Sequence, residues 1–424
     1  FWANIAGGLV LFGICTAMAP LAARFFKNEL VAPVLIVSSI GLLISSFGVV
    51  HRASLLRRLD FKAVAVADIG SSFGYGTVSI LLAALGFGVW ALVYGTLFGS
   101  FVGVVLWWIG FRWRPSFSFS GQKFLDLFRF GANVMGTGIV GYCHQNVDYL
   151  VIGRRLGAFP LGIYTLAFKL VSLPLTKISY VVTGVTFPAF SRMQDDDARL
   201  RRGYTKTVRY ISLFAFPVLA GLMLLAPQFV RVIYGPKWLG AVIPLRIMCV
   251  LGMLKAVGTT VGSVLKAKGR PDIEFKYNLL LLVGMSLAVL TGSLHGIVGV
   301  ALAVTLLVVI AFPMIQAVTN RLITLSFKDY LRSLWPAAFA SSGMALLLFV
   351  WKSLLIRLVP GGNLLVLLSS TVLGILLYWG ILRLIGIEEI KEFPLILSQF
   401  PLLGRLFRET TGAKVRPGFM GSPR

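Results

Sequence analysis

The stretch GIYTLAFKLVSLPLTKISYVVTGVTFPAF, residues 162–190, holds enough consecutive apolar side chains to cross a lipid bilayer. A membrane-spanning helix needs about 20 predominantly apolar residues. Two lysines, Lys169 and Lys177, nevertheless stand near its middle. A central lysine costs about 2.5–3.5 kcal/mol on insertion scales, and such residues usually face a bundle interior or a wet cavity. The stretch predicts a membrane span and raises the question of what its lysines meet.

The composition of the whole chain also indicates a membrane protein. Of its 424 residues, 57% are hydrophobic and only 13% are charged, whereas about 25% of the residues of a soluble domain are charged. The net charge is +25, from 40 Lys and Arg against 15 Asp and Glu. A nucleic-acid-binding protein would gather such charge on polar faces, but here it lies between apolar runs, so no nucleic acid is expected as partner.

The apolar runs predict an all-α polytopic membrane protein with about twelve spans. The three cysteines lie within such runs and form no CxxC pair, which excludes a disulfide framework or a zinc site. The expected spans are residues 2–23, 31–50, 63–84, 88–111, 127–146, 159–186, 207–226, 241–265, 275–294, 296–319, 333–356 and 363–386.

The loops between these spans differ in charge. Alternate loops (51–62, 112–126, 191–206, 266–276, 320–332 and the tail from 383) hold 26 Lys and Arg residues, and the loops on the other side hold 8. Cytoplasmic loops carry the excess of Lys and Arg. The first set, including the C-terminus, is therefore expected in the cytoplasm, where it would contact anionic lipids of the inner leaflet.

Two short motifs recur at a common offset. APLAAR at 19–24 matches APQFVR at 226–231, and GFGVWALV from Gly86 is similar to GIVGVALAV from Gly296. The spans between them pair in the same order, which is typical of transporters built from two repeated halves. Because residues 127–206 have no upstream counterpart, we expect two further spans before residue 1, and about fourteen in the intact protein.

The repeat predicts two pseudo-repeated helical lobes followed by two additional spans. The expected divisions are a truncated N-terminal lobe at 1–111, a cytoplasmic linker at 112–126, a C-terminal lobe at 127–320, the additional spans at 321–386 and a basic cytoplasmic tail at 387–424.

Motifs for catalysis are nearly absent. GTGIVG, at 136–141, lies within an apolar span and lacks the strand that a dinucleotide-binding motif needs. GSSFG, at 70–74, matches a nucleophile elbow around Ser72 but has no matching histidine and acid. Close helix packing through small residues is the preferred interpretation, as for Gly95, Gly99 and Gly103. No catalytic residue, cofactor or metal is expected.

The acidic triplet Asp195, Asp196 and Asp197 falls in a predicted cytoplasmic loop. It allows a metal site, but acids before Arg199, Arg201 and Arg202 at the start of a helix are the favoured interpretation, because carboxylates suit helix N-termini.

Charges within or near the spans are the remaining candidates for function. Basic groups near the midplane of a two-lobed bundle predict an anionic cargo, although snorkelling or a structural pair with Asp68 would also explain the lysines. The candidate substrate-binding residues are Lys169, Lys177, Lys255, Arg246, Arg154, Arg155, Asp148 and Asp68.

With these features, the chain resembles the oligosaccharide flippases of bacterial polysaccharide export, in the superfamily of lipid II flippases and multidrug and toxin extruders. The resemblance covers about residues 1–330. Its motifs include TAMAPLAARFF, RRLDFKAVAVAD, FRFGANVM, NVDYLVIGRRLG, LGIYTLAFKLVSLP, FPAFSRMQDDDARLRRGY, LLAPQFVRVIYGPKW and KAKGRPD.

The resemblance implies a non-enzymatic flippase in the bacterial inner membrane. Its cargo would be an oligosaccharide linked to a polyprenyl diphosphate of the undecaprenyl type, moved by alternating access for exopolysaccharide, O-antigen or capsule synthesis. A polymerase and a chain-length regulator of the same pathway would be partners. The alternatives are a multidrug or other lipid extruder, which should carry lumenal acids, and a membrane glycosyltransferase or polymerase, which should show a large external loop or a nucleotide-sugar site.

Overall fold

The computed structural model describes residues 1–58, 60–116, 121–122, 131, 142–143, 145–176, 180–359 and 361–386, with the backbone alone for residues 180–181, 183–185 and 187. Every regular element in these ranges is a helix, in agreement with the predicted all-α class. The chain divides into two compact units, residues 1–142 and 143–424, which are described one at a time. The predicted divisions at 111 and 126 stay predictions, because most of 117–141 lies outside the described ranges.

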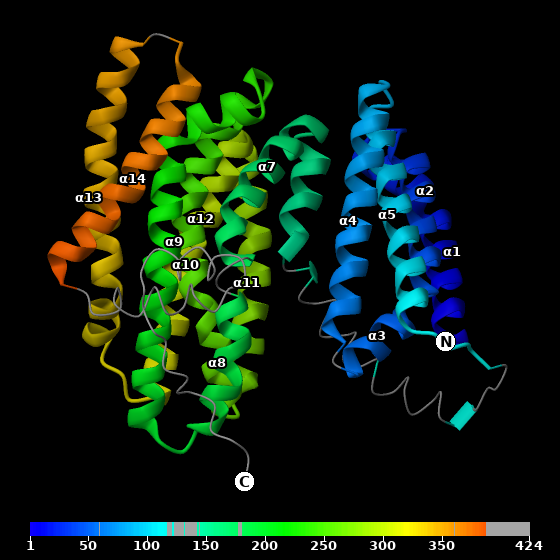
Figure 1. The fold of residues 1–424 in the computed structure, drawn as a ribbon, viewed down its shortest axis with the longest axis horizontal. Coiled ribbons are helices and arrows are strands. Elements are labelled where there is room, and N and C mark those ends of the chain that lie inside the picture. Colours follow the sequence, from blue (N-terminus) through cyan, green and yellow to red (C-terminus); the bar gives the residue numbers. More distant parts are fainter. Residues whose placement is uncertain are drawn as a thin grey trace, which may run out of the picture. The chain divides into compact units, whose positions relative to one another are not determined.

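The first unit consists of α-helices that run side by side in Figure 1. α1 packs against α2, α2 against α5, and α4 against α5. The helices are α1 (Trp2–Phe26), α2 (Val31–Ser46), α3 (Val49–Arg57), α4 (Phe61–Ala84) and α5 (Val89–Gly110).

Small residues allow α4 and α5 to approach closely. The hydroxyl of Ser71 on α4 donates to the carbonyl of Gly99 on α5 at 2.8 Å. A Cβ at Gly99 would lie 2.8 Å from the carbonyl oxygen of Ser71, and a Cβ at Gly103 would lie 3.3 Å from its Cβ. Gly70 and Gly74, the glycines of GSSFG, face Leu106 and Phe98 of α5 in the same way. The predicted small-residue packing is confirmed for this helix pair.

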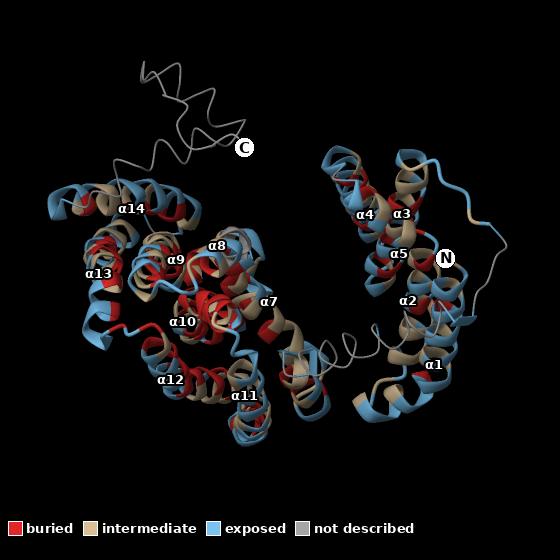
Figure 2. Cartoon of the chain, turned by 90° about the horizontal axis from the view of Figure 1, so that it is seen from below, coloured by how far each residue is buried: buried red, intermediate tan, exposed pale blue. Residues whose placement is uncertain are grey.

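The second unit is larger. Its helices are α7 (Ala158–Pro174), α8 (Tyr180–Arg192), α9 (Asp197–Ile233), α10 (Val242–Ala267), α11 (Pro271–Gly292), α12 (Gly296–Leu322), α13 (Phe327–Leu358) and α14 (Asn363–Ile385), with short 3₁₀ helices η2 (Pro236–Ala241) and η3 (Ser293–His295). α10 contacts α7, α8, α9 and α12. Buried residues gather on the sides of α9, α10 and α12 that face one another (Figure 2). α13 and α14 pack on the other side of α9.

Eight helical segments of the described residues are long and apolar enough to span a membrane, or nine when the bent pair α2 and α3 counts as one span. One of the eight, Pro271–Leu322, comprises both α11 and α12. α2 and α3 meet at 43°, so the predicted span 31–50 ends in a bend rather than a straight helix. The predicted span 159–186 includes α7 and the first part of α8, and residues 177–179 between these helices lie outside the described ranges. The predicted span 127–146 lies mostly outside them as well.

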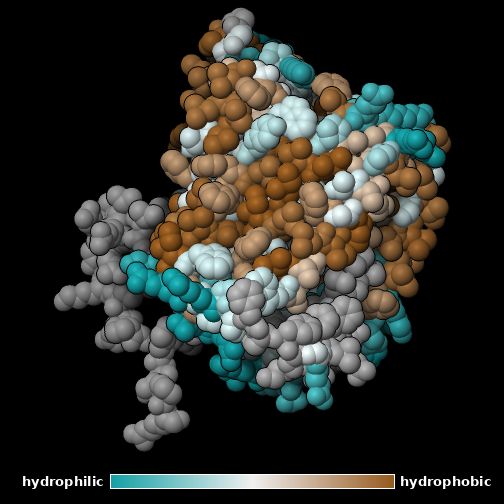
Figure 3. Space-filling model, turned by 90° about the vertical axis from the view of Figure 1, so that its right-hand side faces the viewer, coloured by the Kyte–Doolittle hydropathy of each residue, from teal (hydrophilic) through white to brown (hydrophobic). Residues whose placement is uncertain are grey.

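The outward surface of the helices is apolar, as contact with lipid requires. Figure 3 shows a broad hydrophobic area on one face of the molecule, with hydrophilic side chains towards its edges. α1 alone exposes several large apolar side chains, namely Leu9, Val10, Leu11, Ile14, Met18 and Leu21. Together with the lengths of the helices, this surface identifies a multi-pass membrane protein.

Candidate functional site

Lys169 lies on the outer side of α7. The opposite side of this helix packs into the second unit through Ile163, Tyr164, Ala167, Leu170 and Val171. The Lys169 side chain is exposed and forms no hydrogen bond or ion pair with any of the residues that the structure describes. It shares its exposed stripe with Leu173 and Thr176, one and two turns further on. Lys177, the second lysine of the opening stretch, lies outside the described ranges, so its placement stays a prediction.

Asp148 is buried, with 2% of its surface exposed. The hydroxyl of Tyr164 on α7 donates to its Oδ2 at 2.8 Å, and the backbone N–H of Tyr149 donates to its Oδ1 at 3.0 Å. A buried carboxylate is tolerated only when such donors or a cation compensate for its lost hydration. Tyr164 therefore fixes the carboxylate within the unit, a role that the residue pattern did not predict.

Lys255 supplies the compensating cation. Its ammonium group, on α10, acts electrostatically on Asp148 and lies 5.1 Å from the centre of the Phe168 ring. Phe168 in turn stacks with Tyr164, their ring centres being 6.4 Å apart. A cation over an aromatic face is attracted by the ring quadrupole. The structure thus brings Asp148 and Lys255 into one cluster with Tyr149, Tyr164 and Phe168, in which Asp148 and Tyr164 are buried and the other three are half-buried.

Two arginines, Arg154 and Arg155, follow Asp148 along the chain. Arg155 donates to the carbonyl of Leu290 and to the hydroxyl of Ser293, both at 3.0 Å, and thereby caps the C-terminal end of α11. A cation at a helix C-terminus is stabilised by the helix dipole. Arg154 is exposed at the same end of the helical segment 145–155. The described bonds of Arg155 therefore go to the end of α11, whereas the carboxylate of Asp148 accepts from Tyr164 and from the backbone of Tyr149.

Arg246 on α10 donates from Nε to the carbonyl of Met223 on α9 at 3.2 Å. Beside it, Lys352 on α13 donates from Nζ to the next carbonyl, that of Leu224, at 2.8 Å. The charge of Arg246 acts on Lys352. Lys352 lies near the end of the predicted span 333–356, and no feature of the residue pattern groups it with Arg246.

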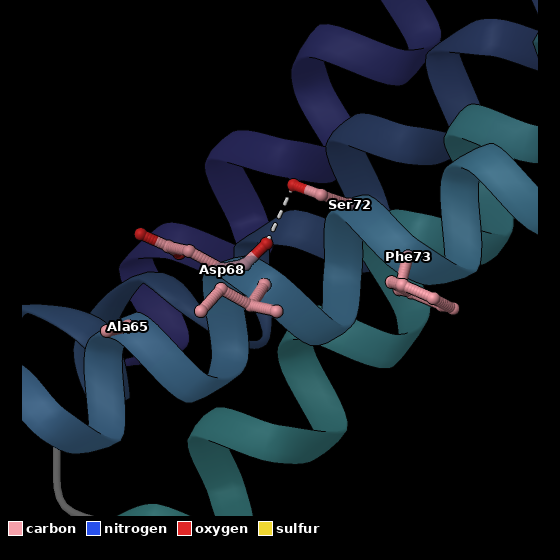
Figure 4. A pocket seen from close by; sticks show the side chains of 5 residues that line it. Ala65, Asp68, Ser72 and Phe73 are labelled. Atoms are coloured by element: carbon pink, nitrogen blue, oxygen red, sulfur yellow. Dashed lines mark hydrogen bonds between the residues drawn. The ribbon is translucent and has the colours of Figure 1, made fainter. Parts of the chain in front are cut away.

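Asp68 lies in the first unit, on an exposed side of α4. Its carboxylate lies 3.8 Å from Nη2 of Arg52 on α3, and Arg52 also lies over the ring of Trp107. Figure 4 shows the open pocket of about 540 Å³ that this side of α4 lines, with the hydroxyl of Ser72 bonded to the backbone carbonyl of Asp68. The lining residues are Ala65, Asp68, Ile69, Ser72 and Phe73. Within the unit, the described ion partner of Asp68 is Arg52.

The acidic triplet starts a helix. The carboxylate of Asp196 caps α9 by accepting from the backbone N–H of Arg199 at 2.9 Å. Asp197 pairs with Lys268, which also donates to the carbonyl of Gln194 at 2.6 Å. The favoured helix-starting interpretation is confirmed for these residues. No group of three or more potential metal ligands occurs in the described part of the chain.

His51 is a buried structural residue. Its Nε2 donates to the carbonyl of Trp113 at 3.2 Å, and its ring stacks on Trp108. His144 and the GTGIVG motif at 136–141 lie outside the described ranges.

Comparison with known proteins identifies the family. The family model described as polysaccharide biosynthesis protein matches residues 1–243. The teichuronic acid biosynthesis protein TuaB of Bacillus subtilis (strain 168) is 32% identical over 82% of this chain and 73% of its own length. The lipopolysaccharide biosynthesis protein WzxC of Escherichia coli (strain K12) is 30% identical over 79% of this chain and 69% of its own length. The succinoglycan biosynthesis transport protein ExoT of Rhizobium meliloti (strain 1021) is 29% identical over 70% of this chain and 60% of its own length.

Solved structures share the fold. The lipid II flippase MurJ, in its inward closed conformation, is similar with a TM-score of 0.74 and 16% identity, over 92% of this chain and 83% of MurJ. An inward-facing multidrug resistance transporter of the MATE family has a TM-score of 0.61 and 19% identity, over 76% and 81%. The family match over more than half of the chain, together with the identity to TuaB, leads to one conclusion: the chain belongs to the polysaccharide biosynthesis protein family.

Proposed function

We propose that this protein is a transporter rather than an enzyme, and that it moves a lipid-linked oligosaccharide repeat unit across the membrane for the synthesis of an extracellular polysaccharide. Relatives with names in teichuronic acid, lipopolysaccharide and succinoglycan biosynthesis support this proposal. The fold is that of a lipid II flippase and of MATE transporters. A polar sugar head cannot cross hydrocarbon unaided, because its hydroxyls would lose their hydrogen bonds to water.

The observation that carries the proposal is the exposed ammonium group of Lys169. It belongs to an apolar helix, and no described residue pairs with it. A lipid-facing lysine at this place would be costly, whereas a wet cavity holding an anion would stabilise the charge. In this account Lys169 and Lys177 meet the diphosphate of a carrier of the undecaprenyl type, or the carboxylates of acidic sugars, during transit.

Ammonium groups suit a moving anion. A lysine is a point charge on a flexible stem and does not demand the bidentate geometry of an arginine. The cargo would pass between two lobes that open alternately to the two sides of the membrane. Lys255 belongs to this account through its electrostatic attraction to Asp148 within the second unit.

The same proposal implies a cellular location and protein partners. In this account the protein lies in the bacterial inner membrane with its C-terminus in the cytoplasm, next to anionic lipids, and the excess of Lys and Arg in alternate loops supports this orientation. A polymerase that uses the translocated unit and a chain-length regulator would act beside the protein.

The test removes the positive charge of each lysine and keeps the length and polarity of its side chain. In the full-length protein, Lys169→Gln and Lys177→Gln should reach the membrane at parental levels, while polymer export falls and lipid-linked repeat units accumulate inside. Lys→Arg variants should retain more export, because they keep the positive charge. Cell-surface polymer and extracted lipid-linked oligosaccharide are measured side by side.

Lys237→Gln is the matched control, because Lys237 is an exposed lysine on the short helix η2, before the start of α10. It should export polymer normally. Parental export by both Gln variants would rule out the lysines as the anion site. Loss of the variants from the membrane would instead assign the lysines a structural role.

A further inference from the structure

Two prolines interrupt the hydrogen bonding of α9, and their surroundings differ. Proline lacks an N–H, so the carbonyl four residues earlier loses its helical donor. For Pro217 that carbonyl belongs to Leu213, and the hydroxyl of Tyr378 on α14 donates to it at 2.7 Å. A single neutral hydroxyl is therefore enough to satisfy a carbonyl freed by proline in this helix.

At the second proline, Pro227, the freed carbonyl belongs to Met223 and accepts from the guanidinium of Arg246. The ammonium of Lys352 bonds to the adjacent carbonyl of Leu224. Two full positive charges thus lie at adjacent carbonyls, of which Pro227 frees only one, and at Pro217 a single neutral hydroxyl fills that role. α9 packs against both helices that supply them, α10 and α13 (Figure 2).

No carboxylate among the described residues forms an ion pair with either cation. Each cation has one described hydrogen bond, so most N–H donors of both groups have no described acceptor. The two like charges also repel each other. An anion between them would remove the repulsion and occupy the remaining donors.

Both cations interrupt exposed apolar stripes. On α10, Arg246 is flanked one turn away on each side by Ile243 and Val250, which are 55% and 38% exposed. On α13, Lys352 is flanked in the same way by Phe349 and Ile356, which are 56% and 43% exposed. The surrounding surface is therefore one that lipid chains would cover.

The depth of the pair fits a lipid headgroup. Arg246 lies four residues after the start of α10, about 6 Å along the axis, and Lys352 lies six residues before the end of α13, about 9 Å. Both helix ends belong to the side that the charged loops place outside. A lipid bound at this depth would have its phosphate near these helix ends, and its acyl or prenyl chains would lie against the apolar stripes.

We propose that Arg246 and Lys352 bind the phosphate of a lipid at the outer side of the second unit, next to the carbonyl of Met223 that Pro227 frees and the adjacent carbonyl of Leu224 on α9. This chemistry has two sources, an anionic phospholipid of the membrane and the diphosphate of a polyprenyl carrier. Both lipids present phosphate oxygens above apolar chains. A competition experiment, in which the polyprenyl diphosphate is added to protein that has bound phospholipid, distinguishes them.

The experiment measures lipid retention by the purified full-length protein. The protein is equilibrated with equal amounts of phosphatidylglycerol and phosphatidylcholine, and bound lipid is read by native mass spectrometry. The parental protein should retain phosphatidylglycerol preferentially. Arg246→Gln/Lys352→Gln should lower that retention about tenfold, whereas Arg246→Lys/Lys352→Arg should keep most of it.

Arg231→Gln/Lys237→Gln is the matched control, since it removes one arginine and one lysine that are exposed at the same end of the unit. It should retain lipid like the parental protein. The single variant Lys352→Gln leaves Arg246 on the carbonyl freed by Pro227, so it should fold normally and still lose retention several-fold. This variant decides the matter if the double variant does not accumulate.

Added undecaprenyl diphosphate separates the two sources. Displacement of phosphatidylglycerol from the parental protein would assign the site to the carrier, and undisturbed binding would assign it to a phospholipid. Equal retention by parental and Lys352→Gln protein, or no preference of the parental protein for either lipid phosphate over phosphatidylcholine, would overturn the proposal.

Discussion

Asp148 and Lys255 illustrate what single residues reveal in a membrane sequence. Both were recognisable as candidates because charge within an apolar segment is costly. Their association was not recognisable, since 107 positions separate them and the link depends on how α10 packs beside α7. Tyr164 was missed for the same reason, because a tyrosine in an apolar run has no signal until its hydroxyl is seen to donate to Asp148.

The coupling of this pair is open to measurement. Asp148→Asn and Lys255→Met should each destabilise the protein, because each removes the compensating charge of its partner. The loss should stay below the about 3–5 kcal/mol of a fully buried pair, since Lys255 is only half-buried. Combining both substitutions should recover part of the loss. The measurement is a double-mutant cycle on denaturation midpoints in detergent. Strictly additive losses would mean that the two groups do not interact.

At the scale of helices, α9 shows why its residue pattern was informative and incomplete. The apolar run predicted a span at 207–226, and the helix continues well beyond both ends, from Asp197 to Ile233. Pro217 and Pro227 would ordinarily be read as helix breaks. The helix passes through both because Tyr378 and Arg246, from other helices, bond to the freed carbonyls. Such compensation depends on tertiary contacts that no local pattern contains.

This compensation predicts a rescue. Tyr378→Phe should lower stability by about 1–3 kcal/mol, because the carbonyl of Leu213 loses its donor. Adding Pro217→Ala should return most of the loss, since an alanine at this position would supply the helical N–H that proline lacks. Thermal midpoints of the parental, single and double variants give the answer. A double variant no more stable than Tyr378→Phe alone would contradict this role for Tyr378.

For the whole molecule, composition and the length of apolar runs were sufficient to predict the all-helical membrane class, because lipid leaves few alternatives for the backbone. Small-residue packing was also predictable, as Gly99 and Gly103 against Ser71 illustrate. The candidate site was less predictable. Arg155 and Arg246 were grouped with the lysines by charge alone, yet each bonds to the carbonyl of a neighbouring helix.

The alternation of charged loops predicts the topology of the whole chain. A reporter fused at the C-terminus and one inserted in the loop 191–206 should both report the cytoplasm, because these segments carry the excess of Lys and Arg. A reporter inserted near Gly240, at the other end of α9, should report the outside. A cytoplasmic signal at Gly240 would overturn the assigned sidedness and the number of spans.

The central claim is that this protein moves a lipid-linked oligosaccharide through a pathway that contains Lys169. Its most direct test reconstitutes the full-length protein in vesicles with purified lipid-linked repeat unit and follows the accessibility of the sugar to an added glycosidase. The parental protein should expose repeat units from the inner leaflet, Lys169→Gln should do so at least about tenfold more slowly, and Lys237→Gln should match the parental rate. Exposure no faster than in protein-free vesicles, under conditions where the protein is folded, would contradict the account.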